Sequence, residues 1–208
     1  MKPLLVLWLT VVAGISATTV TALGQTPYSY NCASDRVLIG VRGWQGMWMD
    51  GAQAICAKIR SDGTINSSDV VYTTRAGGTG GWGTTSGTYR CPSGQVLTGF
   101  VGGRGSYVNT IRTLDCQPFD AGRRISVDPI GFVTAFAQKS GTYLTDLCQY
   151  GMVARGISGK AGIYLDTFGL ECGYVSGAER PTYGGGTRST DQPKIICTPR
   201  PENNYCRR

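Results

Sequence analysis

Short runs of apolar and β-branched residues alternate along this chain with glycine-rich turns, and one arrangement of them recurs three times. Each copy reads Gly-apolar-x-Gly-x-x-Gly-x-aromatic-apolar-Asp/Asn, beginning at Gly40, Gly99 and Gly156. Apolar runs lie on both sides of the glycines, and two such runs joined through glycine predict a β-hairpin. Because an internal repeat determines the architecture, three hairpins are expected to form the framework of the fold.

Two cysteines bracket each copy of the repeat at nearly constant spacing, with one extra residue in the second copy. Eight cysteines allow about 105 pairings, and the repeat selects one of them. Equal hairpin arms bring the ends of each copy together, so each disulfide is expected to close the base of its own hairpin. Closing a loop of this size contributes about 3–4 kcal/mol on the chain-entropy model. The predicted pairs are Cys32 with Cys56, Cys91 with Cys116, Cys148 with Cys172, and Cys197 with Cys206 in the tail.

The sequence predicts no metal site and no cofactor. It contains no histidine, and no two cysteines stand in the CxxC spacing that structural zinc sites usually use. The remaining alternative to the disulfide pairing is a set of unrelated cysteines at chance spacing.

Near the start of the chain, Lys2 precedes an apolar run from Leu4 to Ala13, and small residues follow that run. This order is typical of a secretory signal peptide, which we expect over residues 1–24 with cleavage after Gly24; cleavage after Ala17 is the alternative. The even number of cysteines agrees with an oxidising, extracellular destination. No second long apolar run follows, so no membrane span is predicted.

The mature chain, residues 25–208, is expected to form one domain that ends in a polar tail over 198–208. Further strand candidates lie between the repeats, for example at Asp69–Thr74, and no amphipathic stretch of convincing length predicts a helix. Glycine accounts for 31 of 208 residues, but 41% of the residues are hydrophobic, which fits an all-β protein better than a disordered chain.

Each repeat therefore contributes a hairpin and its neighbouring strands. The repeats are centred on residues 32–56, 91–116 and 148–172. Three such units are expected to form three sheets around a pseudo-threefold axis, each burying its inner face against the other two.

The second repeat resembles the vitelline membrane outer layer protein family. That resemblance implies a β-prism of three Greek-key sheets with disulfides, in agreement with the repeat. The family's acidic Asp-Asp-Thr-Ala segment is missing, and the segment RGSYV stands in its place. The matching positions are Trp82, Gly83, Cys91, Pro92, Gly94, Gly99, Phe100, Asn109, Ile111, Arg112 and Cys116.

The third repeat is similar to the jacalin-related lectins, which also have a β-prism fold. The resemblance implies that a Gly-x-x-x-Asp loop binds a monosaccharide through the aspartate and backbone amides. Plant lectins of this group usually lack disulfides, and the second repeat has Asn109 in place of the acid. The matching positions are Gly162, Tyr164, Leu165 and Asp166 in the third repeat, and Gly46, Trp48, Met49 and Asp50 in the first.

These loop residues have side chains suited to sugars. An aspartate accepts hydrogen bonds from two neighbouring hydroxyls, and an aromatic ring can stack on the apolar face of a sugar. Residues two apart in a strand share a face, so Trp48 is expected beside Asp50 and Tyr164 beside Asp166. The alternative is that the aromatics belong to the core and the acids cap tight turns.

Enzymatic function is not predicted. The absence of histidine excludes histidine-dependent catalysis, and paired cysteines leave no thiolate nucleophile. A glycosidase would need two adjacent carboxylates, whereas Asp50 and Asp166 are expected on different sheets. The net charge of +7 and the many arginines indicate attraction to acidic glycans or anionic surfaces, unless the arginines are merely scattered over the surface; nucleic acid is not predicted as a partner.

The leading hypothesis is thus a secreted, non-catalytic carbohydrate-binding protein with glycans or glycoconjugates as partners. It would present up to three related loops. The alternatives are a structural or coat protein of an extracellular layer that acts through protein–protein contacts, and an inhibitor or toxin-like module.

Overall fold

The computed structural model describes residues 25–80, 84–120, 122, 131–136, 141–149 and 151–175, and the backbone of 196–198 and 205–207. These residues form strands, turns and loops, without a helix. Accordingly, this part of the chain contains no helix with the length and hydropathy of a membrane span. The predicted signal peptide, residues 1–24, lies outside the described residues.

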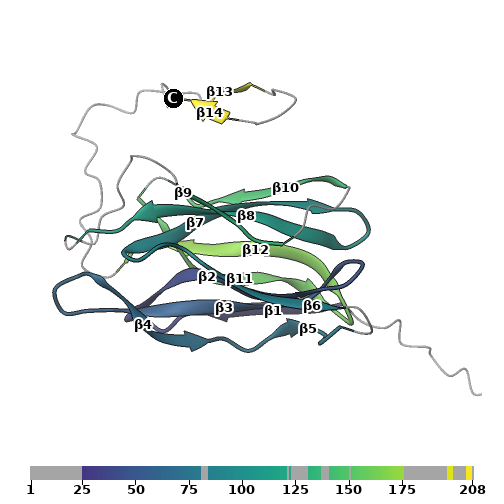
Figure 1. Cartoon of the computed structure of the whole chain (residues 1–208), viewed down its shortest axis with the longest axis horizontal. Coiled ribbons are helices and arrows are strands. Elements are labelled where there is room, and N and C mark those ends of the chain that lie inside the picture. Colours follow the sequence, from purple (N-terminus) through teal and green to yellow (C-terminus); the bar gives the residue numbers. More distant parts are fainter. Residues whose placement is uncertain are drawn as a thin grey trace, which may run out of the picture.

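Three antiparallel sheets make up the body of the protein (Figure 1). Each contains one of the three predicted hairpins: β2 with β3, β7 with β8, and β11 with β12. Sheet one consists of β2 (Arg36–Gln45), β3 (Met49–Ile59), β4 (Ile65–Tyr72), the short β5 (Ala76–Gly77) and β6 (Thr85–Arg90). Sheet two consists of β7 (Gln95–Arg104), β8 (Val108–Pro118), β9 (Gly131–Thr134) and β10 (Thr142–Leu147). Sheet three consists of β1 (Thr26–Asn31), β11 (Val153–Ala161) and β12 (Leu165–Gly173).

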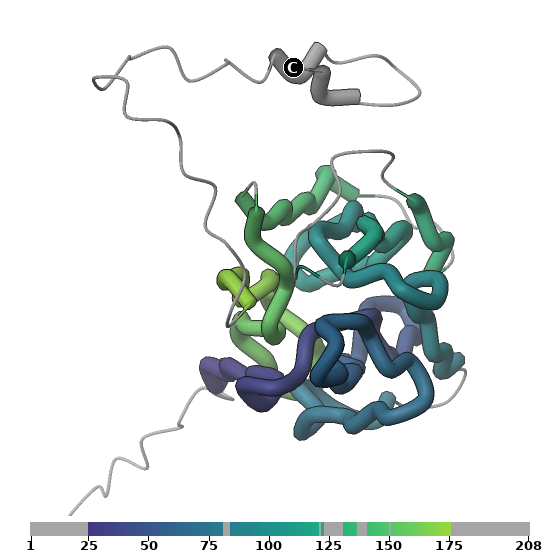
Figure 2. The backbone as a smooth tube through the Cα atoms, turned by 90° about the vertical axis from the view of Figure 1, so that its left-hand side faces the viewer, coloured from purple at the N-terminus to yellow at the C-terminus, as the bar shows by residue number. Residues whose placement is uncertain are grey.

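The strand order is that of a Greek key. Sheet two runs β10-β7-β8-β9 and sheet one runs β6-β2-β3-β4, so the fourth strand of each unit returns to lie beside the first. In sheet three the N-terminal strand β1 takes this place beside β11. Each of these returning strands is followed in the chain by the hairpin of another sheet: β6 by β7 and β8, β10 by β11 and β12, and β1 by β2 and β3. Figure 2 shows the resulting three lobes around a common centre. The fold is an all-β β-prism, as predicted.

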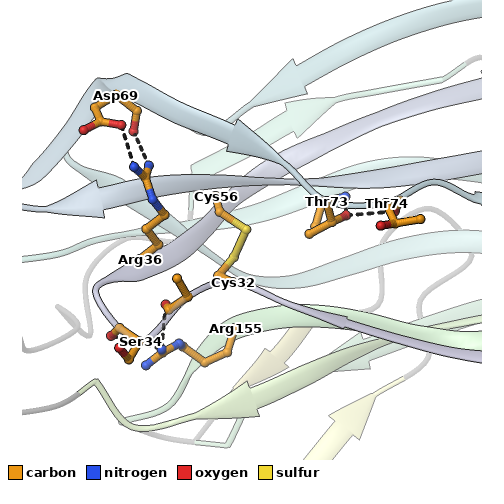
Figure 3. Close-up of a disulfide and its surroundings, with 10 residues drawn as sticks. Cys32, Ser34, Arg36, Cys56, Asp69, Thr73, Thr74 and Arg155 are labelled. Atoms are coloured by element: carbon orange, nitrogen blue, oxygen red, sulfur yellow. Dashed lines mark hydrogen bonds and ion pairs between the residues drawn. A yellow bond between two sulfur atoms is a disulfide. The ribbon is translucent and has the colours of Figure 1, made fainter.

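The three repeat disulfides have the predicted pairing, but they do not close the hairpins on themselves. Cys32 follows β1, and its N–H donates to the carbonyl of Arg155 on β11 at 2.6 Å, whereas its partner Cys56 lies in β3. The bond therefore joins sheet three to sheet one (Figure 3). The other two bonds repeat this relationship: Cys91–Cys116 joins sheets one and two, and Cys148–Cys172 joins sheets two and three.

The C-terminal segment contains one more hairpin, β13 (Ile196–Thr198) with β14 (Tyr205–Arg207). The backbones of Cys197 and Cys206 lie opposite each other in this pair. Their side chains are outside the described residues, so the fourth disulfide stays a prediction.

The main core lies between the three sheets. Equivalent positions of the three repeats fill it, as predicted for the apolar residues on either side of each glycine tip. They are Val41, Phe100 and Ile157 before the tip, and Met49, Val108 and Leu165 after it, all buried.

The first glycine of each repeat is required by close packing of strands. A Cβ at Gly40 would overlap the carbonyl oxygen of Tyr89 on β6. At Gly156 a Cβ would stand 2.5 Å from the carbonyl oxygen of Tyr30 on β1. The returning strand therefore approaches each hairpin at a residue without a side chain. Of the two glycines at the third tip, Gly159 has a positive φ of 155° and Gly162 does not; Gly46 of the first tip does not either.

Candidate functional site

The three hairpins end in three-residue tips of the same design. In each tip the N–H of the glycine donates to the carbonyl of the aromatic residue two positions later. These bonds measure 2.9 Å for Gly46 to Trp48, 2.9 Å for Gly105 to Tyr107, and 3.0 Å for Gly162 to Tyr164. The tips are therefore well-defined turns that hold equivalent side chains in equivalent places.

The three tip aromatics meet in one cluster. Ring centroids are 5.1 Å apart for Trp48 and Tyr107, 5.0 Å for Trp48 and Tyr164, and 5.2 Å for Tyr107 and Tyr164. Distances of this size, with tilted or edge-on geometry, are typical of favourable aromatic pairs. Each ring thus contacts the other two tips. This arrangement favours a structural role at the meeting point of the hairpins over a separate stacking platform in every loop.

The residues next to the aromatics divide into buried and exposed sets. Leu165, which the lectin resemblance places among the binding residues, is fully buried in the main core, so its side chain contributes to packing. By contrast, Met47 and Ile163 at the tips are 71% and 63% exposed. The end of the prism therefore carries two exposed apolar side chains around the aromatic cluster, which sequence reasoning did not single out.

Asp50 in the first repeat is enclosed. Only 3% of this residue is exposed, and the hydroxyl of Thr84 donates to its Oδ2 at 3.0 Å. A Cβ at Gly80 would stand 2.6 Å from the same oxygen, and one at Gly46 would stand 3.1 Å from it. Among the described residues, the carboxylate thus lies against Gly46, Gly80 and Thr84 and has little access to solvent.

The glycine loop after β4 lies beside Asp50. The N–H of Gly78 contacts both the carbonyl of Asp50 at 2.8 Å and the carbonyl of Ile163 at 3.2 Å. This loop therefore bridges the first and third hairpin tips. Trp82 and Gly83, which the resemblance to the vitelline membrane outer layer family matches, are outside the described part of the chain.

Asn109, the equivalent residue of the second repeat, is half-buried between two other segments. Its carbonyl accepts a hydrogen bond of 2.9 Å from the Gln45 side chain. A Cβ at Gly141 would stand 2.6 Å from its Nδ2. The space around Asn109 is therefore also occupied.

Asp166 in the third repeat is the accessible member of the set. It is half-buried, and the Gln25 side chain donates to its Oδ1 at 3.0 Å. Gly162, four positions earlier, is exposed, and a Cβ built on it meets no atom within 4 Å. The third repeat thus combines a partly exposed carboxylate with a tip glycine that has open space beside it.

The partners of these three polar residues also follow the repeat. Gln25, Thr84 and Gly141 stand at the same distance before Cys32, Cys91 and Cys148, respectively. Sequence reasoning missed them, although their common spacing from the cysteines was a signal. They differ in size and chemistry, and this difference is what makes the three loops unequal.

No protein-family model matches the chain, and no curated protein matches it. The resemblance to the vitelline membrane outer layer family is therefore not confirmed. Solved structures similar to this one include the Calystegia sepium agglutinin, at 18% identity and a TM-score of 0.48 over 73% of this chain and 90% of that one. A prostate-specific WGA16 glycoprotein lectin has 13% identity and a TM-score of 0.47 over 73% and 93%. Frutalin from Artocarpus incisa, in complex with galactose, has 11% identity and a TM-score of 0.45 over 70% and 98%.

Proposed function

We propose that this protein is a secreted, non-catalytic carbohydrate-binding module whose sugar site is the loop from Gly162 to Asp166. The observation that carries the proposal is that the Asp166 carboxylate is partly exposed in a loop whose tip glycine, Gly162, has open space beside it. A carboxylate next to an accessible backbone is suited to the hydroxyls of a sugar ring.

The chemistry of this loop supports the proposal. Gln25 holds Asp166 through Oδ1, and a carboxylate has lone pairs on both oxygens for further donors. Hydrogen bonds to an ionised acceptor are stronger than those between neutral groups. The glycine at 162 allows a ring to approach the main chain. Tyr164 and Ile163 offer apolar surface on the same tip, and Ile163 is largely exposed.

The proposal assigns one principal site per chain. In the first loop Thr84 and the neighbouring glycines enclose Asp50. In the second loop Asn109 lacks the charge of an acid and lies against Gly141. Binding by Asp50 or Asn109 would require their neighbours to move. We therefore expect a stoichiometry nearer to one sugar per chain than to three.

The same placement supports a non-catalytic role. Asp50 lies on β3 of sheet one and Asp166 on β12 of sheet three. The two acids therefore stand on different sheets, with the aromatic cluster between their hairpin tips. A general acid and a nucleophile would have to flank a single bond, and this pair belongs to separate loops.

The test is a glycan array with the oxidised, secreted protein at low and at physiological salt. We expect binding to a defined glycan that survives physiological salt, since the site does not depend on the net charge. Asp166→Asn should abolish that binding, while Asp50→Asn and the exposed Asp62→Asn should keep it. Glycan binding that is unchanged in Asp166→Asn would disprove the assignment of the loop.

A structural role through protein contacts is the second candidate, and one observation favours it. Phe132, Tyr143 and Leu147 on the strands at the edges of sheet two are 55%, 59% and 55% exposed. Exposed apolar groups of this kind often mark protein-binding surfaces. If no glycan binds and the purified protein self-associates through these residues, the structural role takes first place.

A further inference from the structure

Sheet one carries an ordered group of arginines and aromatic rings on its outer face. Val41 on β2 points into the main core. Because successive side chains of a strand point to opposite faces, Arg42 and Trp44 lie on the outer face. Arg42 is exposed and Trp44 is half-buried. The register places Thr88 opposite Arg42 and Ser86 opposite Trp44 on the neighbouring strand β6. Residues paired in this way lie on the same face of a sheet. The outer face thus combines a cation, an aromatic ring and hydroxyl groups.

Two aromatic rings hold three guanidinium groups. The guanidinium carbon of Arg42 lies 5.0 Å from the centre of the Trp44 ring, and that of Arg75 lies 4.9 Å from the same ring. Arg42 and Arg90 each stand 5.9 Å from the Tyr72 ring. The Arg90 Nη2 also donates to the Tyr72 hydroxyl at 2.7 Å. We call these five residues the arginine face.

Glycines on the central strands give the long side chains room to lie flat. The Arg75 Cδ would be 3.3 Å from a Cβ at Gly51, and Gly51 is the β3 partner of Trp44. Arg90 pairs with Gly40 in the register of β6 and β2. The arginines therefore lie across the sheet instead of extending freely into solvent.

The positive charge of the arginine face is available to a ligand. Within the described part of the chain, none of its three arginines forms an ion pair with a carboxylate; the recorded ion pair joins Arg36 to Asp69 at 2.7 Å. Arg42 and Arg90 are exposed, and Arg75 is half-buried. Cations without carboxylate partners on one flat surface produce a concentrated positive potential.

We infer that the arginine face is a second binding site, separate from the loop of Asp166, and that its ligand is an anionic polysaccharide bearing sulfate or carboxylate groups. A guanidinium binds such groups through two parallel hydrogen bonds. Because the rings already restrict the arginine side chains, less conformational entropy is lost on binding. Ser86 and Thr88 are exposed on the same face and can bond the neutral hydroxyls between the charged groups.

The details of the surface favour a polysaccharide over two other anionic partners. Single-stranded nucleic acid is bound through bases stacked on aromatic rings, whereas the rings of Trp44 and Tyr72 already carry guanidinium groups. Protein surfaces that bind membranes combine cations with apolar side chains that enter the lipid. The arginine face, with Ser86 and Thr88, includes no aliphatic side chain for this purpose.

The experiment measures binding of the oxidised, secreted protein to heparin, polygalacturonate and neutral dextran as a function of salt. The variant Arg42→Gln/Arg75→Gln/Arg90→Gln should lose at least about tenfold in affinity for the preferred polyanion near 0.15 M ionic strength. For this variant, the slope of log K against the logarithm of the salt concentration should become shallower by about 2–3, because fewer counterions are released on binding. Dextran should bind neither protein at this face.

The matched control removes three positive charges elsewhere, in Arg60→Gln/Arg104→Gln/Lys160→Gln. These residues are exposed on sheets one, two and three or the turns next to them. The control variant should keep most of the affinity for the polyanion. An equal loss of affinity in both triple variants would show that only the net charge matters, and it would overturn the assignment of this site. A third variant, Arg42→Lys/Arg75→Lys/Arg90→Lys, keeps the charge but loses the planar groups, so it should bind more weakly than the original protein.

Parallel measurements with a single-stranded DNA oligonucleotide and phosphatidylserine vesicles test the class of ligand. Tighter binding to either of them than to both polysaccharides would overturn the polysaccharide assignment. Asp166→Asn should leave polyanion binding unchanged. A failure of the polyanion site can therefore be distinguished from a failure of the proposed sugar site. Thermal unfolding of each variant verifies that it is folded.

Discussion

Cys32 directly follows β1 of sheet three and Cys56 lies in β3 of sheet one, so the disulfide between them joins two different sheets. The same relationship holds for the two other repeat disulfides. Together the three bonds connect the sheets in a closed ring. A disulfide in this position constrains the packing of two sheets as well as the loop between its cysteines.

Removal of a buried disulfide should therefore destabilise the whole domain. Cys116 is fully buried and Cys91 nearly so, and we expect Cys91→Ala/Cys116→Ala to lower the free energy of unfolding by about 3–5 kcal/mol. Urea denaturation at neutral pH measures the loss. A change below about 1 kcal/mol would contradict a role for this bond in holding sheets one and two together.

The third disulfide should be the first to open under a mild reductant. Cys172 is exposed and Cys148 half-buried, whereas Cys56 and Cys116 are fully buried. Thiol–disulfide exchange needs access of the attacking thiolate to sulfur. Alkylation during partial reduction, followed by peptide mapping, should label Cys148 and Cys172 first. Earlier labelling of Cys56 or Cys116 would show that exposure does not control the order.

The aromatic cluster should couple the hairpin tips energetically. Trp48 and Tyr164 are in edge-on contact, with centroids 5.0 Å apart, and such pairs contribute about 0.5–1.5 kcal/mol beyond simple burial. A double-mutant cycle with Trp48→Leu and Tyr164→Leu should give a coupling free energy in this range. Additive effects within about 0.3 kcal/mol would mean that the tips are energetically independent.

Two glycines of the repeat should differ strongly in their tolerance of the same substitution. Gly40→Ala would place a Cβ into the backbone of Tyr89, so β6 or β2 must shift, and we expect a loss of about 2 kcal/mol or more. Gly162→Ala meets no atom within 4 Å and should change stability by less than about 0.5 kcal/mol. Thermal or urea unfolding of the two variants tests this contrast, which would fail if both variants had the stability of the original protein.

Much of the fold could be predicted because the repeat is regular. The cysteine spacing indicated three disulfide pairs, and the apolar residues beside the glycines indicated the hairpins and their shared core. The exchange of strands between sheets could not be predicted, since β1, β6 and β10 have the same local pattern whichever hairpin they join. This exchange explains why Gly40 is needed for close strand contact and why the disulfides do not close single hairpins.

The candidate site was predictable in its positions and not in its accessibility. The spacing identified Asp50, Asn109 and Asp166 as equivalent residues. Their exposure depends on Thr84, Gly141 and Gln25, which stand just before β6, β10 and β1 and lie near them only after folding. The aromatic cluster was missed for a related reason, because Trp48, Tyr107 and Tyr164 lie in the turns, where strand periodicity does not determine direction.

The stability of the protein should depend on the protonation of Asp115 on β8. This residue is buried, pairs in register with Gly99 and Phe132, and has no hydrogen-bond partner for its Oδ1 among the described residues. Loss of hydration on burial raises the pKa of its carboxyl to about 6. The folded state therefore holds a proton that the unfolded chain, with an ordinary carboxyl pKa of about 3.9, releases.

Asp115 thus favours folding at low pH, and this contribution is lost as the pH rises from about 4 to about 6. We expect Asp115→Asn to increase the free energy of unfolding by about 1–3 kcal/mol at pH 8 and to change it little at pH 4. Asp62→Asn is the matched control, because hydrogen bonds from Thr64 lower the pKa of the exposed Asp62. That variant should be no more stable than the original protein at pH 8. Urea denaturation at several pH values compares the two, and a stabilisation by Asp115→Asn that does not vary with pH would show that the buried charge is not its cause.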